Sequence, residues 1–282
     1  MAETPSETHA ATAPGWPGWL IATAICVRFY SRLPLPAMPG ERDVHSLPDF
    51  RVVPRALPFA ALVIALPAAL ILLGTGLAGV GAMLAGALAV AVLVFTTGVF
   101  HEDGLADSAD GLFGGHTPER RLEIMKDSRI GSYGGSAMVL TLLLRASALA
   151  SILDAGGAWA AAAALMAAAP WSRFEGLRLL ASQDQARASG TAASVGQATP
   201  ATVAVAGGLA AVIATLLALV GGLPLSGLVL GLGLAHLASR WLAQLAQRLI
   251  GGQTGDILGA AQQISEFAVY LGFALALGLG WP

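Results

Sequence analysis

Residues 78–99 read AGVGAMLAGALAVAVLVFTTGV and contain no charged side chain. An α-helix rises 1.5 Å per residue, so a run of about 20 apolar residues can cross a hydrocarbon core of about 30 Å. Over the whole chain of 282 residues 56% are hydrophobic and 11% are charged, whereas a soluble domain carries about 25% charged residues. The stretch therefore predicts a transmembrane helix in an integral membrane protein.

Similar apolar runs recur along the chain, and they are continuous and rich in Ala and Leu, unlike the alternating strands of a β-barrel. We expect an all-α, polytopic membrane helix bundle of about seven transmembrane helices. Residues 16–30 are apolar but short, and they predict an additional N-terminal helix that is either interfacial or re-entrant. The predicted spans are 57–73, 78–99, 135–153, 157–171, 201–220, 224–243 and 257–280.

The ends of the chain complete this organisation. Residues 1–15 are polar and rich in Ala, Thr and Pro, which predicts a disordered tail. No Lys or Arg precedes Arg28, so we do not expect a secretory signal peptide. Residues 16–282 are predicted to form a single integral membrane catalytic domain.

Basic residues indicate the orientation of the bundle. Under this topology almost every Lys and Arg falls on one side, and the opposite turns near 74–78, 154–156 and 221–222 contain none. The positive-inside rule therefore places the long polar segments in the cytoplasm. Arg145 and Arg240 lie within spans, where an arginine usually faces the bundle interior, although Arg240 could equally snorkel to the interface. Glu266 is expected to pair with such an arginine.

An acidic segment, FHEDGLADSADG at residues 100–111, follows the second span. If it is helical, Asp103, Asp107 and Asp110 at i, i+4 and i+7 share an arc of about 60°, and Glu102 lies about 100° away. Like charges on one face repel, so a cation is expected, and Mg²⁺ prefers such hard oxygen ligands. The alternative is a solvated helix end. Leu105 stands where a zinc motif or a calcium loop would need a ligand.

Three other polar features lie on the same predicted side. Thr117-Pro118-Glu119 predicts the start of a short interfacial helix. Lys126 and Arg129 in KDSRIG could hold phosphate oxygens, although such charges are often solvated or bind lipid headgroups. The loop GGQTGD at 251–256 enters the last span, where helix N-termini favour anions. Asp256 could be a ligand contact there or an N-cap, and His101 could be a site residue or structural.

Composition also excludes several functions. The formal net charge is −2 and no basic block is present, so nucleic acid is not an expected partner. Cys26 is the single cysteine, which excludes an intramolecular disulfide and a cysteine-rich metal site.

Three motifs occur in order at these membrane positions: H-x-D-G-L-A-D-x-x-D-G, R-x-L-E-I-M-K-D-S-R-x-G and G-G-Q-T-G-D-x-L-G-A. With them the chain resembles the cobalamin synthase family, the adenosylcobinamide-GDP ribazoletransferases, from about Arg28 to the C-terminus. The resemblance implies joining of α-ribazole or its 5′-phosphate to adenosylcobinamide-GDP with release of GMP, late in vitamin B12 biosynthesis. It also implies a Mg²⁺ cofactor and an active site at the cytoplasmic face of the bacterial inner membrane.

The resemblance assigns roles to matching residues. The expected metal ligands are Glu102, Asp103, Asp107 and Asp110. The expected catalytic residues are Asp103, Asp107, Asp110, Lys126 and Arg129, and one Asp would also serve as general base. The resemblance makes Lys126, Arg129 and Asp256 expected substrate contacts, and the residues themselves add His101, Gly104, Thr254 and Gly255 to the expected substrate-binding set. The expected partners are the two small-molecule substrates and the lipid bilayer, and a homo-oligomer is compatible with the sequence.

Two other classes of membrane protein share part of this pattern. A CDP-alcohol phosphotransferase also uses an Asp-rich membrane helix, but its D-G-x-x-A-R pattern is broken by Asp107 and Ser108. An ion-coupled transporter would also place carboxylates in a bundle, but near the membrane midplane rather than at one face beside basic residues.

Overall fold

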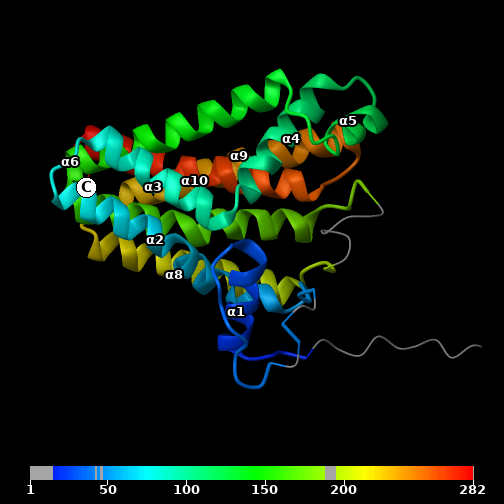
Figure 1. The fold of residues 1–282 in the computed structure, drawn as a ribbon, viewed down its shortest axis with the longest axis horizontal. Coiled ribbons are helices and arrows are strands. Elements are labelled where there is room, and N and C mark those ends of the chain that lie inside the picture. Colours follow the sequence, from blue (N-terminus) through cyan, green and yellow to red (C-terminus); the bar gives the residue numbers. More distant parts are fainter. Residues whose placement is uncertain (1–14, 42, 45–46, 188–194, 282) are drawn as a thin grey trace, which may run out of the picture.

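The computed structural model describes residues 15–41, 43–44, 47–187 and 195–281, and this part of the chain is helical (Figure 1). The predicted disordered tail lies outside the described residues apart from Gly15. In chain order the elements are α1 (Trp19–Tyr30), the 3₁₀ turn η1 (Val53–Ala56), α2 (Leu57–Leu77), α3 (Ala82–Thr97), α4 (Phe100–Gly114), α5 (Pro118–Ile124), α6 (Ser132–Ser182), α8 (Pro200–Val220), α9 (Leu225–Ile250) and α10 (Gly255–Gly278).

The helices confirm a polytopic membrane bundle. Among the described residues five are long and apolar enough to cross a membrane, or six if the bent pair α3 and α4 is one span. The longest, α6, has 51 residues and is interrupted at Gly157, where φ is 83° and ψ is 176°. Figure 1 shows its two halves running in opposite directions across the molecule. The predicted spans 135–153 and 157–171 are therefore the two arms of a hairpin.

The N-terminal helix α1 is too short to span the membrane. It packs against α2 and η1, and its end carries Phe29 and Tyr30 toward α4, where Phe29 lies 6.2 Å from the ring of Phe100. The prediction of a short additional helix is confirmed. The choice between interfacial and re-entrant stays a prediction.

A sharp turn separates α3 from α4. Gly98 and Val99 both adopt left-handed backbone conformations with φ of 66°, and the two helices meet at 91°. Glycine accepts this conformation without cost, whereas a β-branched valine there is strained. The turn redirects the polar sequence after α3, so α4 lies with α5 at the end of the molecule opposite the C-terminus, outside the five spanning helices (Figure 1).

Helices α9 and α10 approach each other through glycine. A Cβ atom built on Gly231 would lie 2.9 Å from the carbonyl oxygen of Val269, and one on Gly227 would lie 3.0 Å from that of Gly272. Small residues let helix backbones come close, which is the usual basis of packing inside membranes. This contact fixes the position of α10, whose first turn carries Asp256.

A buried charge network joins α4, α6 and α10. Arg145 of α6 donates to Glu102 at 3.0 Å, to Gln263 at 2.9 Å and to Glu266 at 2.5 Å, and all four side chains are buried. The expected pairing of Glu266 with an intramembrane arginine is confirmed. Because one guanidinium bonds to two carboxylates, it connects all three helices at the point where they meet.

Replacing Gly98 by alanine should destabilise the protein. A side chain is unfavourable at φ of 66°, and the new Cβ atom would lie 2.5 Å from Nε of Arg32. We expect a loss of about 1–2 kcal/mol, measured by thermal unfolding in detergent. Gly208→Ala is the matched control, because nothing lies within 4 Å of a Cβ atom at that helical position. Equal thermal midpoints for the two variants would contradict this account of the turn.

Replacing Arg145 by methionine should destabilise the bundle strongly, because it leaves two carboxylates buried without a cation. Breaking a buried ion pair on one side costs about 3–5 kcal/mol. We expect a large drop in thermal midpoint and in the folded fraction after detergent extraction, partly restored by a second change, Glu266→Gln. Arg240→Met, at an exposed arginine of α9, is the control. An Arg145→Met protein as stable as that control would show the network to be dispensable.

Candidate active site

Three aspartates meet where α4 passes the start of α10, and we call them the acidic face: Asp103, Asp107 and Asp256. A Cβ atom on Gly104 would lie 2.9 Å from the carbonyl oxygen of Asp256, so the two backbones are in contact. Asp103 is exposed and Asp107 is half-buried, one helical turn apart as the sequence predicted. The contact with α10 brings Asp256 to the same place.

The acidic face is electrostatically unfavourable on its own. Partial burial, together with the charges of Asp103, Asp256 and Asp110, raises the pKa of Asp107 from 3.8 to about 7. Like charges oppose each other's ionisation and a nearby cation relieves that opposition. The face therefore attracts a positive ion or a cationic group.

The other two predicted ligands are used elsewhere. Glu102 is buried in the Arg145 network, where one oxygen accepts from Arg145 and Gln263. Asp110 accepts backbone N–H groups at the start of α6, from Gly131 at 2.6 Å and Gly134 at 2.8 Å. It therefore caps the N-terminus of α6, where a carboxylate is favourable. The four predicted carboxylates do not form one cluster.

These positions decide which kind of metal site the residues fit. In the described part of the chain no group of three His, Cys, Asp or Glu side chains could by itself hold a metal ion. Mg²⁺ does not need such a cage, since it is usually held by one or two carboxylates and completed by water and substrate phosphates. Asp103 and Asp107, with Asp256 beside them, fit that donor set.

A cation that sequence reasoning did not single out lies next to the acidic face. Arg187 donates to Asp256 at 3.3 Å and to the carbonyl of Leu122 at 3.0 Å, so it joins α10 to α5. Two backbone hydrogen bonds hold the segment of Arg187 in place. The N–H of Ala186 donates to the carbonyl of Gln253 at 2.8 Å, and the N–H of Gln253 donates to the carbonyl of Asp184 at 2.9 Å. The pairing of residues 184–186 with residue 253 gives no signal in a single sequence.

The predicted phosphate-binding residues lie at the same end but differ in environment. Lys126 is exposed, and Arg129 donates to Asp127 of its own loop at 2.9 Å. These hydrogen bonds lower the pKa of Asp127 to about 2. The expected start of α5 is confirmed, with Pro118 in the first turn and Thr117 accepting from the backbone of Arg120.

The start of α10 has a clear cap. Thr254 accepts from the backbone N–H of Ile257 at 3.3 Å, so the N-cap is Thr254 and not Asp256. A Cβ atom on Gly255 would meet nothing within 4 Å. Asp256 belongs to the acidic face, and its carboxylate accepts from the hydroxyl of Thr254 at 3.2 Å and from Arg187 at 3.3 Å.

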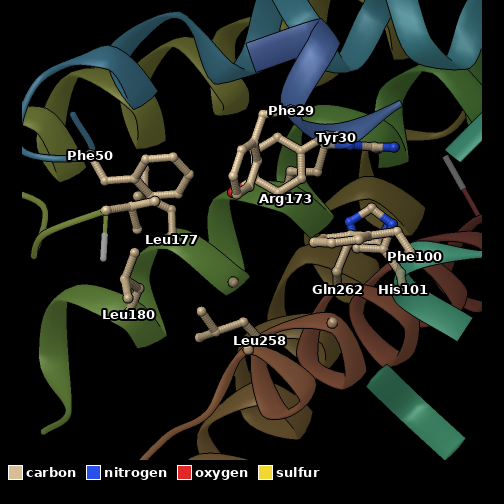
Figure 2. A pocket seen from close by; sticks show the side chains of 14 residues that line it. Phe29, Tyr30, Phe50, Phe100, His101, Arg173, Leu177, Leu180, Leu258 and Gln262 are labelled. Carbon is tan, nitrogen blue, oxygen red and sulfur yellow. The ribbon is translucent and has the colours of Figure 1, made fainter. Parts of the chain in front are cut away.

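His101 lies in a different setting, because it lines the pocket shown in Figure 2, to which Gly255, the residue before Asp256, also contributes. Its ring stacks on Tyr30, with centroids 6.0 Å apart and planes at 8°. We call this the aromatic pocket, and α1, α4, α6 and α10 all contribute to it. Its lining residues are Phe29, Tyr30, Phe50, Phe100, His101, Arg173, Gly176, Leu177, Leu180, Val195, Gly255, Leu258, Gly259 and Gln262.

Comparisons with known proteins find relatives over most of the chain. The family model described as cobalamin-5-phosphate synthase matches residues 22–274. A protein of Azorhizobium caulinodans named adenosylcobinamide-GDP ribazoletransferase is 45% identical over 246 residues, covering 87% of this chain and 92% of its own length. Proteins with the same name from Xanthobacter autotrophicus and Rhizobium meliloti are 44% and 40% identical, each covering 89% of this chain and 95% of their own length. No solved structure matches the chain.

Helix bundle, acidic face and adjoining pocket define a polytopic membrane enzyme whose polar site lies at one end of the bundle. The match over most of its length then identifies the family: the chain belongs to the cobalamin-5-phosphate synthases.

The raised pKa of Asp107 predicts a pH-dependent stability in the presence of a chelator. In the unfolded chain this carboxyl ionises near pH 4, whereas in the folded protein it holds its proton to about pH 7. The folded state therefore binds more protons between these values, and stability should fall as pH rises through that window.

Asp107→Asn should remove the contribution of Asp107 to this dependence, so the variant should be more stable than the parent at pH 8 and similar near pH 4.5. Thermal unfolding in detergent at both pH values measures the difference. Asp154→Asn, at an exposed aspartate of α6 far along the chain from α4, should leave the parent's pH profile unchanged. Parallel profiles for the parent and Asp107→Asn would contradict the proposed repulsion.

Proposed function

We propose that the protein joins α-ribazole, or its 5′-phosphate, to adenosylcobinamide-GDP with release of GMP. The names of its relatives support this activity. The single structural observation that carries the proposal is the acidic face, where Asp103, Asp107 and Asp256 meet beside Arg187. Oxygen ligands and a cation in one place suit a diphosphate substrate with its metal ion.

The reaction would be a displacement at phosphorus. A hydroxyl of the acceptor attacks the phosphorus on the cobinamide side of the diphosphate, and a new P–O bond forms as the bond to GMP breaks. The acceptor loses a proton and GMP leaves with the electrons of the broken bond. Asp103 and Asp107 would hold Mg²⁺, which when bound supplies charge stabilisation for the phosphate oxygens.

The chain's own cations would position the substrate. Arg187 already contacts Asp256, and its planar guanidinium can donate to phosphate oxygens as well. Lys126 and Arg129 stay candidates for the same task, because both are exposed at this end of the bundle. Arg145 would act indirectly by holding Glu102 and thereby α4 against α10.

We further propose that this end faces the cytoplasm of a bacterial inner membrane. The exposed basic residues Arg120, Lys126 and Arg129 lie in or beside α5. Short connections rich in Lys and Arg favour the cytoplasmic side. Nucleotide-activated substrates would then reach the acidic face directly.

Asp103→Asn should lower the rate of GMP release by about 100-fold or more, because it removes one of the two carboxylates that would hold Mg²⁺. The assay uses purified protein in detergent with adenosylcobinamide-GDP and α-ribazole, with and without Mg²⁺. Asp154→Asn should keep parental turnover. Near-parental activity in Asp103→Asn would refute the metal site, and no GMP release by the parent would refute the proposed reaction.

A further inference from the structure

Arg173 is buried in the aromatic pocket with hydrogen-bond donors unused. Its side chain is 3% exposed, and one Nη donates to the carbonyl of Ala169 at 3.1 Å. Nε and the other Nη have no partner among the described residues. A buried donor without a partner is costly, so it is usually explained by a ligand or a functional demand.

A nearby carboxylate partly neutralises the charge of Arg173, but two of the nitrogen donors of Arg173 have no hydrogen-bond partner among the described residues. Glu266 attracts the guanidinium and Arg145 repels it, so Arg173 and Arg145 together balance Glu102 and Glu266. Glu266 instead accepts its hydrogen bonds from Arg145 and Gln262. Charge balance therefore accounts for the presence of a cation at this position and leaves the free donors unexplained.

The walls around Arg173 are flat and apolar. Figure 2 shows Arg173 beside Tyr30, with the stacked ring of His101 nearby. The ring centroids of Phe29 and Phe50 lie 5.1 Å apart in the adjoining part of the wall. Aromatic walls with a few placed polar groups are typical of pockets that take a planar ring.

The pocket shares structure with the acidic face. Gly255 and Gly259 line the pocket, and Asp256 follows Gly255 directly. On α4, His101 lines the pocket and Asp103 belongs to the acidic face. A ligand bound in the pocket would thus contact the same segments of α4 and α10 that carry Asp103 and Asp256.

We propose that the aromatic pocket binds the planar heteroaromatic base of a nucleoside or nucleotide group of a substrate, and that Arg173 donates hydrogen bonds to an acceptor atom on it. This inference rests on the proposed function. Among the bases of the two substrates, that of the acceptor nucleoside α-ribazole and the guanine of the GDP group are each joined through a sugar to the reacting groups, whereas the adenine of the adenosyl group is not, so the first two are the candidates. Both share the chemistry of a flat ring with acceptor atoms, and the test separates them.

The test measures binding rather than turnover. Purified protein in detergent is titrated calorimetrically with α-ribazole and, separately, with GMP. Arg173→Lys keeps the charge that balances Glu266 but loses the guanidinium fork. It should weaken one of the two ligands at least about tenfold, with an unchanged thermal midpoint. The affected ligand identifies the base that occupies the pocket.

Tyr30→Leu provides a second variant at a half-buried position. Loss of base stacking should weaken the same ligand about fivefold or more. Arg240→Met, outside the pocket, should bind both ligands as the parent does. Unchanged affinity for both ligands in Arg173→Lys and Tyr30→Leu would overturn the proposal, as would equal weakening of both ligands together with a lowered thermal midpoint.

The two proposals fail separately. If the parent binds a base in the pocket but releases no GMP, the proposed reaction is wrong and the pocket assignment stands. If the parent releases GMP and neither pocket variant changes binding, the pocket assignment alone is wrong.

Discussion

The structure depends on the ion pairs of Arg145. A single guanidinium, buried among apolar helices, contacts carboxylates from α4 and α10 and belongs to α6. Burying three charges is favourable only if their geometry is good, and the remaining amide of Gln263 contributes two further hydrogen bonds. With Glu102 fixed in this way, the next residue on α4 is Asp103, which turns outward. The network therefore places the acidic face without being part of it.

Glycine contacts add the second constraint. Gly104 brings α4 against the start of α10, and Gly231 brings α10 against α9. Side chains at these points would separate the helices and move Asp256 away from Asp103. The arrangement of the polar residues at the end of the bundle thus depends on close backbone contacts between its helices.

Much of this was predictable from local sequence pattern. Apolar runs located the spans, and a spacing of four placed Asp103 and Asp107 on one face. The pairing of Glu266 with an intramembrane arginine also followed, because an unpaired charge in a membrane is unfavourable. The uses of Glu102 and Asp110 did not follow, since their partners lie 43 and 21 residues further along the chain. Helical periodicity describes the residues of one helix, whereas a helix cap or an ion pair also depends on residues of a neighbouring helix. Arg187 and the aromatic pocket were not predicted from the sequence for the same reason.

The Arg145 network also bears on how the protein enters the membrane. Glu102 is synthesised 43 residues before Arg145, whereas Gln263 and Glu266 follow Arg145 by 118 and 121 residues. A ribosome therefore delivers Arg145 to the translocon with one of its two carboxylate partners already made and the other not yet translated. Lateral release of α6 into lipid would expose a partly neutralised charge until the last helix arrives. Insertion of α10 is then the event that closes the bundle, and chains truncated before it lack the Glu266 carboxylate that completes the pairing of Arg145.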